Sequence, residues 1–165
     1  MIPTPPHNVH LPFEKTPMPV AVMAADYPSG AVVTPHRHRR AQLLYAIEGV
    51  MVIETEVGRW VAPPTWAVWL PAGLEHGTRM SGTVRVRTVY VEPGANEYMP
   101  RQNCVVAVSP LLRELILAAV HIPLDYQPGS RHEMLMELLL AEIAETPRSA
   151  SLFAHAQQCE TARHM

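Results

Sequence analysis

Cysteine is scarce in this sequence, which has only two cysteines among its 165 residues. Cys104 and Cys159 lie far apart and share no motif spacing. Disulfide frameworks and cysteine-rich zinc sites need several cysteines at short, repeated spacings. We therefore expect free thiols at both positions.

Long apolar runs are also missing. The longest, Leu111–Val120 and Met134–Ala141, are too short to span a bilayer as a helix. The segment from Met1 to Pro19 is rich in proline and has no apolar stretch of the kind found in signal peptides. These absences predict a cytoplasmic protein without a membrane partner.

Positive charge is not in excess. Lys and Arg number 13 against 15 Asp and Glu, which gives a formal net charge of −2. A surface that neutralises several phosphates needs a basic patch, so we expect no direct DNA binding by this chain alone. With 48% hydrophobic residues, the composition is that of a globular protein, and 165 residues suffice for one domain with a substantial core.

The chain divides into parts that differ in composition and residue pattern. Residues 1–17 contain repeated prolines and are expected to form an extended arm, while 147–165 are mixed and polar and are expected to form a tail. Residues 18–108 consist of short β-forming runs cut by turn residues, which predicts an all-β sandwich or barrel. Glu48-Gly49 is interpreted as a tight hairpin turn. The predicted strands are Val20–Ala25, Ala41–Ile47, Val50–Glu56, Trp60–Val61, Trp66–Leu70, Thr83–Glu92 and Cys104–Val108.

Residues 109–146 change to a helical pattern. Ser109-Pro110 predicts the start of one helix, and Ser130 with Glu133 has the spacing of a capping box before a second. The second helix carries apolar residues on more than one face, which indicates an extra apolar surface for the neighbouring helix or for another subunit. We therefore interpret this part as a helical pair and dimerisation element.

Three histidines and a glutamine form the candidate site. His36 and His38 are separated by one residue, so in an extended segment both side chains point to the same face. Gln42 keeps the same parity, and His76 follows a Pro71–Gly73 turn that would return the chain across the barrel. Three imidazoles and one amide oxygen suit a divalent transition metal such as Zn, Ni, Fe or Mn. A polar pocket of the same residues without a metal is the alternative.

The same residues resemble the two sequence motifs of the cupin superfamily. The first motif has Gln42 where the family usually has Glu, and the sequence departs from the second at Thr65 and Met80, where glycine and asparagine are common. The resemblance covers roughly residues 20–92 and implies a double-stranded β-helix, a jelly-roll-like barrel. The matching residues are Gly30, His36, His38, Gln42 and Gly49 in the first motif, and Pro71, Ala72, Gly73 and His76 in the second.

A compact cupin followed by a helical pair further resembles the N-terminal effector-binding and dimerisation domain of AraC-type transcription regulators. The segments Ala41–Tyr45 and Trp69–Gly73, with His76, carry this resemblance. It implies a small-molecule effector in the barrel and a homodimer through the C-terminal helices. In that family a domain with two helix-turn-helix motifs follows at about the point where this chain ends, so a truncated regulator and a stand-alone relative both stay open.

A small metal-dependent cupin enzyme, of the dioxygenase or isomerase class, is the alternative function. The three histidines favour it, but the pattern offers no inward carboxylate or tyrosine as acid or base, since Tyr45 lies out of parity with Gln42. The sensor is therefore favoured. Because Gln42 is neutral, a bound metal would keep its full charge, which favours an anionic effector such as a carboxylate.

We predict structural roles for the remaining polar and aromatic side chains near the motifs. Alternation turns Arg37, Arg39 and Glu75 away from the histidines, which makes the arginines part of a solvated strand face. Aromatic strand residues belong more often to the core than to a pocket, which is the role predicted for Trp60, Trp66 and Trp69.

Overall fold

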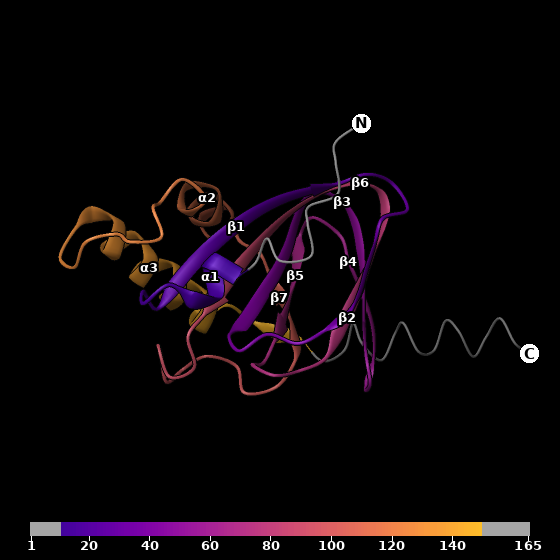
Figure 1. Ribbon diagram of the computed structural model, residues 1–165, viewed down its shortest axis with the longest axis horizontal. Coiled ribbons are helices and arrows are strands. Elements are labelled where there is room, and N and C mark those ends of the chain that lie inside the picture. The colour runs from indigo at the N-terminus through magenta and orange to yellow at the C-terminus, as the bar shows by residue number, and fades with distance from the viewer. Residues whose placement is uncertain (1–10, 150–165) are drawn as a thin grey trace, which may run out of the picture.

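The computed structural model describes residues 11–149 and shows a β-barrel with a pair of helices at one end (Figure 1). The elements are α1 (Leu11–Lys15), β1 (Val20–Tyr27), β2 (Val32–His36), β3 (Ala41–Thr55), β4 (Gly58–Ala62), β5 (Trp66–Leu70), β6 (His76–Val91), β7 (Cys104–Ala107), α2 (Pro110–Ala119), α3 (Arg131–Glu145) and β8 (Arg148–Ser149).

The strands form one antiparallel sheet in the order β1-β6-β3-β5-β7-β8, with β2 added on β6 and β4 on β3. The ladder between β3 and β6 runs from Ala41 opposite Val91 to Thr55 opposite His76, so these two strands form the spine of the barrel. The all-β cupin barrel followed by a C-terminal helical pair, predicted from the sequence, is confirmed. No helix within residues 11–149 is long and apolar enough to cross a membrane.

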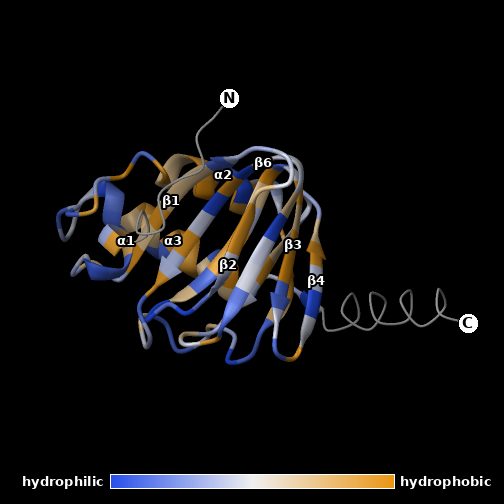
Figure 2. Cartoon of the chain, turned by 45° about the vertical axis from the view of Figure 1, so that its right-hand side comes forward, coloured by the Kyte–Doolittle hydropathy of each residue, from blue (hydrophilic) through white to orange (hydrophobic). Residues whose placement is uncertain are grey.

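The long strand β6 exposes Arg79, Ser81, Thr83 and Arg85 and is buried on both faces from Val86 to Val91. In β6, Val84, Val86 and Tyr90 belong to one apolar cluster inside the barrel, whereas Val89 and Val91 belong to a second cluster on the opposite face. Figure 2 shows hydrophobic and hydrophilic residues alternating along several strands. In this part of β6 the second face is therefore covered by protein.

The helices α2 and α3 cover that second face. Ile116, Leu139 and Ile143 are fully buried against the strands, and burying such a side chain contributes roughly 1.5–3 kcal/mol. The predicted caps are present: the hydroxyl of Ser109 accepts from the amide of Leu112, and that of Ser130 accepts from the amide of Glu133. Local sequence therefore sets where both helices begin.

The hairpin predicted at Glu48-Gly49 is wrong, because β3 continues through these residues and pairs with β6 on both sides of an irregularity. Gly49 has φ +82° and lies so close to the strand β6 that an added Cβ would be 2.2 Å from the carbonyl oxygen of Thr83. The tight turn lies further on, where Thr55 pairs with Gly58 at the start of β4. Glycine marks a bulge here, since only a residue without a side chain fits.

The predicted extended arm is also corrected in its described part. Residues 11–15 form the short helix α1, and residues 1–10 lie outside the described range. At the other end, β8 pairs with β7 within the segment predicted as a tail, and the remainder of that segment, including Cys159, lies outside the described residues. Cys104, on β7, is a free thiol as predicted.

Candidate metal and effector site

The fold brings His36, His38 and His76 together. His36 ends β2 and pairs directly with His76, the first residue of β6, while His38 follows two residues later. One ligand atom from each of the three rings lies within 4.8 Å of the others. The ring centroids are 4.6 Å apart for His36 with His38 and with His76, and 5.3 Å apart for His38 with His76. The predicted convergence of the three imidazoles is what the structure shows.

Each imidazole is oriented through its Nδ1 atom. Nδ1 of His36 lies 2.7 Å from the carbonyl oxygen of Thr34, and Nδ1 of His76 lies 3.0 Å from that of Leu74. Nδ1 of His38 lies 3.1 Å from a carboxylate oxygen of Glu14. Carbonyl and carboxylate oxygens only accept hydrogen bonds, so all three Nδ1 atoms donate and the ring lone pairs are carried by Nε2.

His76 is held in the neutral form. Burial lowers the pKa of its imidazole to about 4, and the nearby His36 acts in the same direction against the hydrogen bond to Leu74. The side chain is almost fully buried. Neutral imidazole is the form that binds metals, so His76 is ready to act as a ligand at neutral pH.

Gln42 lies on the inner face of β3, opposite Tyr90 of β6. Its amide oxygen is buried and has no hydrogen-bond partner within residues 11–149. Tyr90 connects it to the histidines, because the Tyr90 ring packs edge-on against His38 at 5.7 Å and its hydroxyl hydrogen-bonds with Gln42. A buried amide oxygen without a partner is costly unless something else binds it. The donor set therefore fits a divalent metal or a polar ligand.

The sequence profile of the AraC-like ligand-binding domain matches residues 19–157. The chain belongs to this family. NimR of Escherichia coli, an HTH-type transcriptional regulator, is 32% identical over 113 residues, which are 68% of this chain and 41% of NimR. This AraC-like domain thus spans less than half of the length of that relative.

Solved structures resemble the AraC-like domain as well. ToxT from Vibrio cholerae superposes with a TM-score of 0.56 at 9% identity, over 75% of this chain and 54% of ToxT, and shares its fold. A cupin superfamily protein from Desulfitobacterium hafniense superposes with a TM-score of 0.42 at 16% identity, over 45% of this chain and 68% of that protein.

Two residues of the site in the AraC-like domain were not predicted. Tyr90 lies in the predicted strand Thr83–Glu92, but no polar role was predicted for it. Glu14 contacts His38 across 24 positions of sequence, from a segment predicted to be an extended arm. No local pattern could have indicated that contact, whereas the even spacing of Tyr90 from Val84 and Val86 places its side chain on their face of the strand.

The charged residues around the histidines do not form a basic patch. Arg37 is exposed and pairs with Glu75 at 3.1 Å, which keeps both away from the site as predicted. Arg39 is also exposed and pairs with Glu92. Arg40 differs from its neighbours, because its side chain is 1% exposed and lies 2.9 Å from Glu92. Its guanidinium also donates to the carbonyl oxygens of residues 16 and 18 at 2.7 Å, so it anchors the N-terminal segment.

The tryptophans of the AraC-like domain serve the core. Trp60 and Trp69 are buried in different clusters, and Trp66 packs against the barrel interior. The indole of Trp69 donates to the carbonyl oxygen of Pro100 at 2.9 Å, which satisfies its only polar atom.

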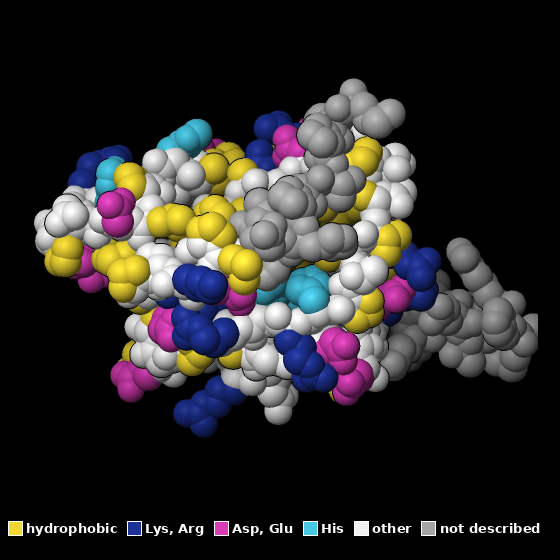
Figure 3. All heavy atoms as spheres, viewed as in Figure 1, with side chains coloured by type: hydrophobic (Ala, Val, Ile, Leu, Met, Phe, Trp, Pro, Cys, Tyr) yellow, Lys and Arg dark blue, Asp and Glu magenta, His cyan; other side chains and the backbone are white. Residues whose placement is uncertain are grey.

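Figure 3 shows histidine side chains at the surface in the middle of one face, beside basic and acidic side chains.

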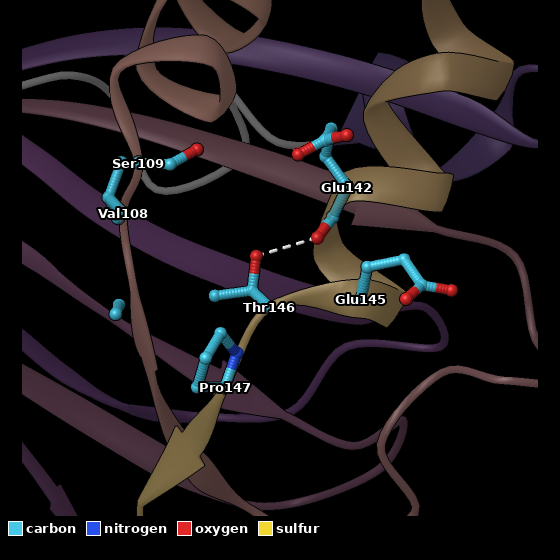
Figure 4. A pocket seen from close by; sticks show the side chains of 7 residues that line it. Val108, Ser109, Glu142, Glu145, Thr146 and Pro147 are labelled. Atoms are coloured by element: carbon cyan, nitrogen blue, oxygen red, sulfur yellow. Dashed lines mark hydrogen bonds between the residues drawn. The ribbon is translucent and has the colours of Figure 1, made fainter.

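A hollow of about 280 Å³ lies between the β7–α2 connection and the end of α3 (Figure 4). The hydroxyl of Thr146 points toward the helix there and donates to the carbonyl oxygen of Glu142 at 2.6 Å. The hollow shares no residue with the histidine site. Its lining residues are Ala107, Val108, Ser109, Glu142, Glu145, Thr146 and Pro147.

Proposed function

We propose that this chain is the effector-sensing domain of a cytoplasmic transcription regulator, and that it binds a small molecule inside the barrel at a divalent transition metal. His36, His38, His76 and Gln42 are the proposed ligands. The observation that carries the proposal is the set of three imidazoles whose Nδ1 atoms all donate to fixed acceptors, so that their lone pairs are on Nε2. In metal-ligating histidines, the ring nitrogen that does not bind the metal typically donates a hydrogen bond of this kind.

The proposed effector is an anion such as a carboxylate. The three imidazoles and the amide of Gln42 are neutral donors, so none of them cancels the charge of a divalent cation. A metal held in this way supplies a Lewis-acidic position for a negatively charged group. Tyr90 would line the same space with a hydroxyl group, since burial raises its pKa and keeps it protonated.

The helical pair is proposed to form a homodimer. Leu111 on α2 and Met134 and Leu138 on α3 are exposed by 48%, 61% and 45%. Met134 and Leu138 are four residues apart, so they lie on one face of α3. Helices that pack only on their own barrel have no need of such residues, and a second copy of the same face would cover them.

A metal-dependent cupin enzyme is the second candidate, and Tyr90 is the observation that favours it. Its hydroxyl is buried beside His38 and could donate a proton to a bound substrate. Its raised pKa makes it a poor base at neutral pH, however, and the chain belongs to a family of ligand-binding domains. The sensor therefore remains the favoured function.

Elemental analysis of untagged protein, purified without chelators, tests the metal. We expect close to one transition metal per chain in the wild type, and none in a His36→Ala/His76→Ala double variant. Wild-type protein that stays empty after exposure to Zn²⁺, Ni²⁺, Fe²⁺ and Mn²⁺ would disprove the metal part of the proposal. Binding of small carboxylates and of their neutral amides, compared by calorimetry on loaded protein, then tests the preference for anions.

Analytical ultracentrifugation tests the dimer. We expect a wild-type dimer at tens of micromolar, and a monomer for Leu138→Glu, because a charge at the centre of the apolar face must be desolvated on pairing. Val61→Glu, at a 54% exposed valine on β4, is the control and should leave the dimer intact. A monomeric wild type would contradict this part of the proposal.

A further inference from the structure

We infer that Glu14 is the positioning residue of His38, and that the short helix α1 is consequently a working part of the histidine site. The inference rests on the proposed metal site and adds to it a supporting residue from the N-terminal segment. It concerns how a ligand is held and not which ligand binds.

Glu14 is hydrogen-bonded to the segment of His38 and Arg39 through both its side chain and its backbone. One carboxylate oxygen accepts from Nδ1 of His38 at 3.1 Å and from the backbone amide of Arg39 at 2.9 Å. The guanidinium of Arg39 in turn donates to the carbonyl oxygen of Glu14 at 2.7 Å. The side chains of His38 and Glu14 are 3% and 11% exposed. Glu14 therefore holds the segment around His38 through three hydrogen bonds, of which the one to the His38 ring is buried.

His38 differs from the other two histidines in the source of its support. The rings of His36 and His76 donate to carbonyl oxygens two residues earlier in their own strands or turns, so their orientation is a local property. The ring of His38 depends on a residue that is 24 positions away and belongs to another element. Displacement of α1 would remove this support from His38 and leave the hydrogen bonds of His36 to Thr34 and of His76 to Leu74 unchanged.

Further contacts hold α1 where it can provide this support. The ring of Phe13 stacks on Tyr90 with centroids 6.1 Å apart. The hydroxyl of Thr16 donates to the carbonyl oxygen of Leu124, in the connection between α2 and α3, at 2.5 Å. Within the four residues 13–16, the N-terminal segment thus contacts the barrel interior, a proposed ligand and the helical pair.

A carboxylate behind His38 also changes the electrostatics of the site. The direct donors are neutral, and Gln42 stands where the cupin motif usually has Glu. A carboxylate that accepts from Nδ1 makes the opposite nitrogen a stronger donor and places one negative charge near the cation. By linkage, binding of the metal and seating of α1 then favour each other to the same extent.

Competition with a chromophoric chelator for Zn²⁺ tests the inference on the full chain. We expect Glu14→Ala to weaken Zn²⁺ binding by about 10–100-fold. Glu14→Gln keeps an acceptor but loses the charge, and should fall between that variant and the wild type. Glu75→Gln is the matched control, because Glu75 adjoins His76 but pairs with exposed Arg37, and its affinity should stay within about twofold of the wild type.

A second measurement needs no metal. Nitrogen-15 spectra of the histidine rings at one fixed pH report which nitrogen carries the proton, and His38 should show Nδ1–H in the metal-free wild type. In Glu14→Ala we expect a mixture of tautomers for His38, with His36 and His76 unchanged. Unchanged signals of His36 and His76 show that the variant is folded. A change confined to His38 then reports the loss of its hydrogen bond to Glu14.

The outcomes separate the two ideas. Unchanged Zn²⁺ affinity and unchanged His38 spectra in Glu14→Ala would overturn the inference while leaving the metal site intact. A wild type that binds no metal would overturn the proposed function, and the spectra of His38 would then decide on Glu14 alone: a tautomer change in Glu14→Ala supports its positioning role, and no change overturns it.

Discussion

The guanidinium of Arg113 on α2 donates a hydrogen bond of 2.8 Å to the hydroxyl of Tyr45 on β3. Tyr45 is 1% exposed and lies three residues from Gln42 on the same strand. The bond therefore joins the helical pair to the strand that carries a proposed ligand. It also gives the hydroxyl of this buried tyrosine, which faces away from the site, a hydrogen-bond partner.

Replacing Tyr45 by phenylalanine should destabilise the protein by about 1–2 kcal/mol, because the charged group of Arg113 loses a partly buried acceptor. Urea denaturation of the metal-free protein measures this change. Tyr98→Phe, at a 68% exposed tyrosine, is the control and should change stability by less than about 0.5 kcal/mol. Equal stability of both variants would show that the bond between strand and helix contributes nothing.

Replacing Gln42 by glutamate should strengthen binding of Zn²⁺ on the order of tenfold, equivalent to about 1.4 kcal/mol, because a carboxylate cancels one unit of the metal's charge. In the absence of metal the same variant should melt at a lower temperature, since its carboxyl group occupies a buried site. Chelator competition and thermal melting, each with and without Zn²⁺, measure the two effects.

The control for this change is Gln127→Glu on the exposed α2–α3 connection, which should alter neither property. Weaker Zn²⁺ binding by Gln42→Glu would place Gln42 outside the ligand set. The histidines alone would then form the site.

The stability of the metal-free protein should fall as the pH drops from about 6.5 to about 4. His76 has a pKa of about 4 in the folded protein and 6.5 as its reference, so between these values the unfolded chain binds a proton that the folded protein excludes. The difference between the two pKa values corresponds to about 3 kcal/mol, lost progressively toward acid pH. Urea denaturation across this range measures the slope.

A His76→Gln variant lacks the titrating group and should show a shallower slope over the same pH range. The comparison between the two proteins isolates His76 from the carboxylates that also titrate toward pH 4. Identical slopes would mean that the imidazole takes up its proton in the folded protein as readily as in the unfolded chain.

Replacing Gly49 by alanine should cost roughly 2 kcal/mol or more, because the position combines φ +82° with an approach of 2.2 Å between the new Cβ and the carbonyl oxygen of Thr83. Gly82→Ala is the matched control, since Gly82 has φ +74° but nothing within 4 Å of an added Cβ. Denaturant titration should show a clearly smaller loss for the control. Equal losses would assign the whole effect to the backbone angle.

The site could be predicted from the sequence because it depends on strand parity. His36 and His38 are two positions apart, and Gln42 follows four positions later, so an extended chain alone places them on one face. The return of His76 was indicated by the turn before it and by the cupin motif. The helices were equally accessible, because Ser109 and Ser130 are caps that act within four residues.

What could not be predicted depends on distant partners. Glu48-Gly49 has the composition of a turn, and only the approach of β6 reveals that the glycine accommodates a bulge. Glu14 and Arg40 are charged residues that are buried because of contacts with each other's segments. Arg40 donates to the carbonyl oxygens of Thr16 and Met18 and so holds the N-terminal segment, in which Glu14 contacts His38. Such contacts exist only after the chain has folded.

Substitutions on the two faces of β3 affect different parts of the molecule. Gln42 and Leu44 face the barrel interior, whereas Leu43 and Tyr45 face the helices. A substitution at an even position therefore alters what the barrel can hold without touching the helical pair, and one at an odd position does the reverse. The lining of the barrel and the packing of the helices can therefore vary independently along a single strand, while any insertion that shifts its register by one residue disrupts both at once.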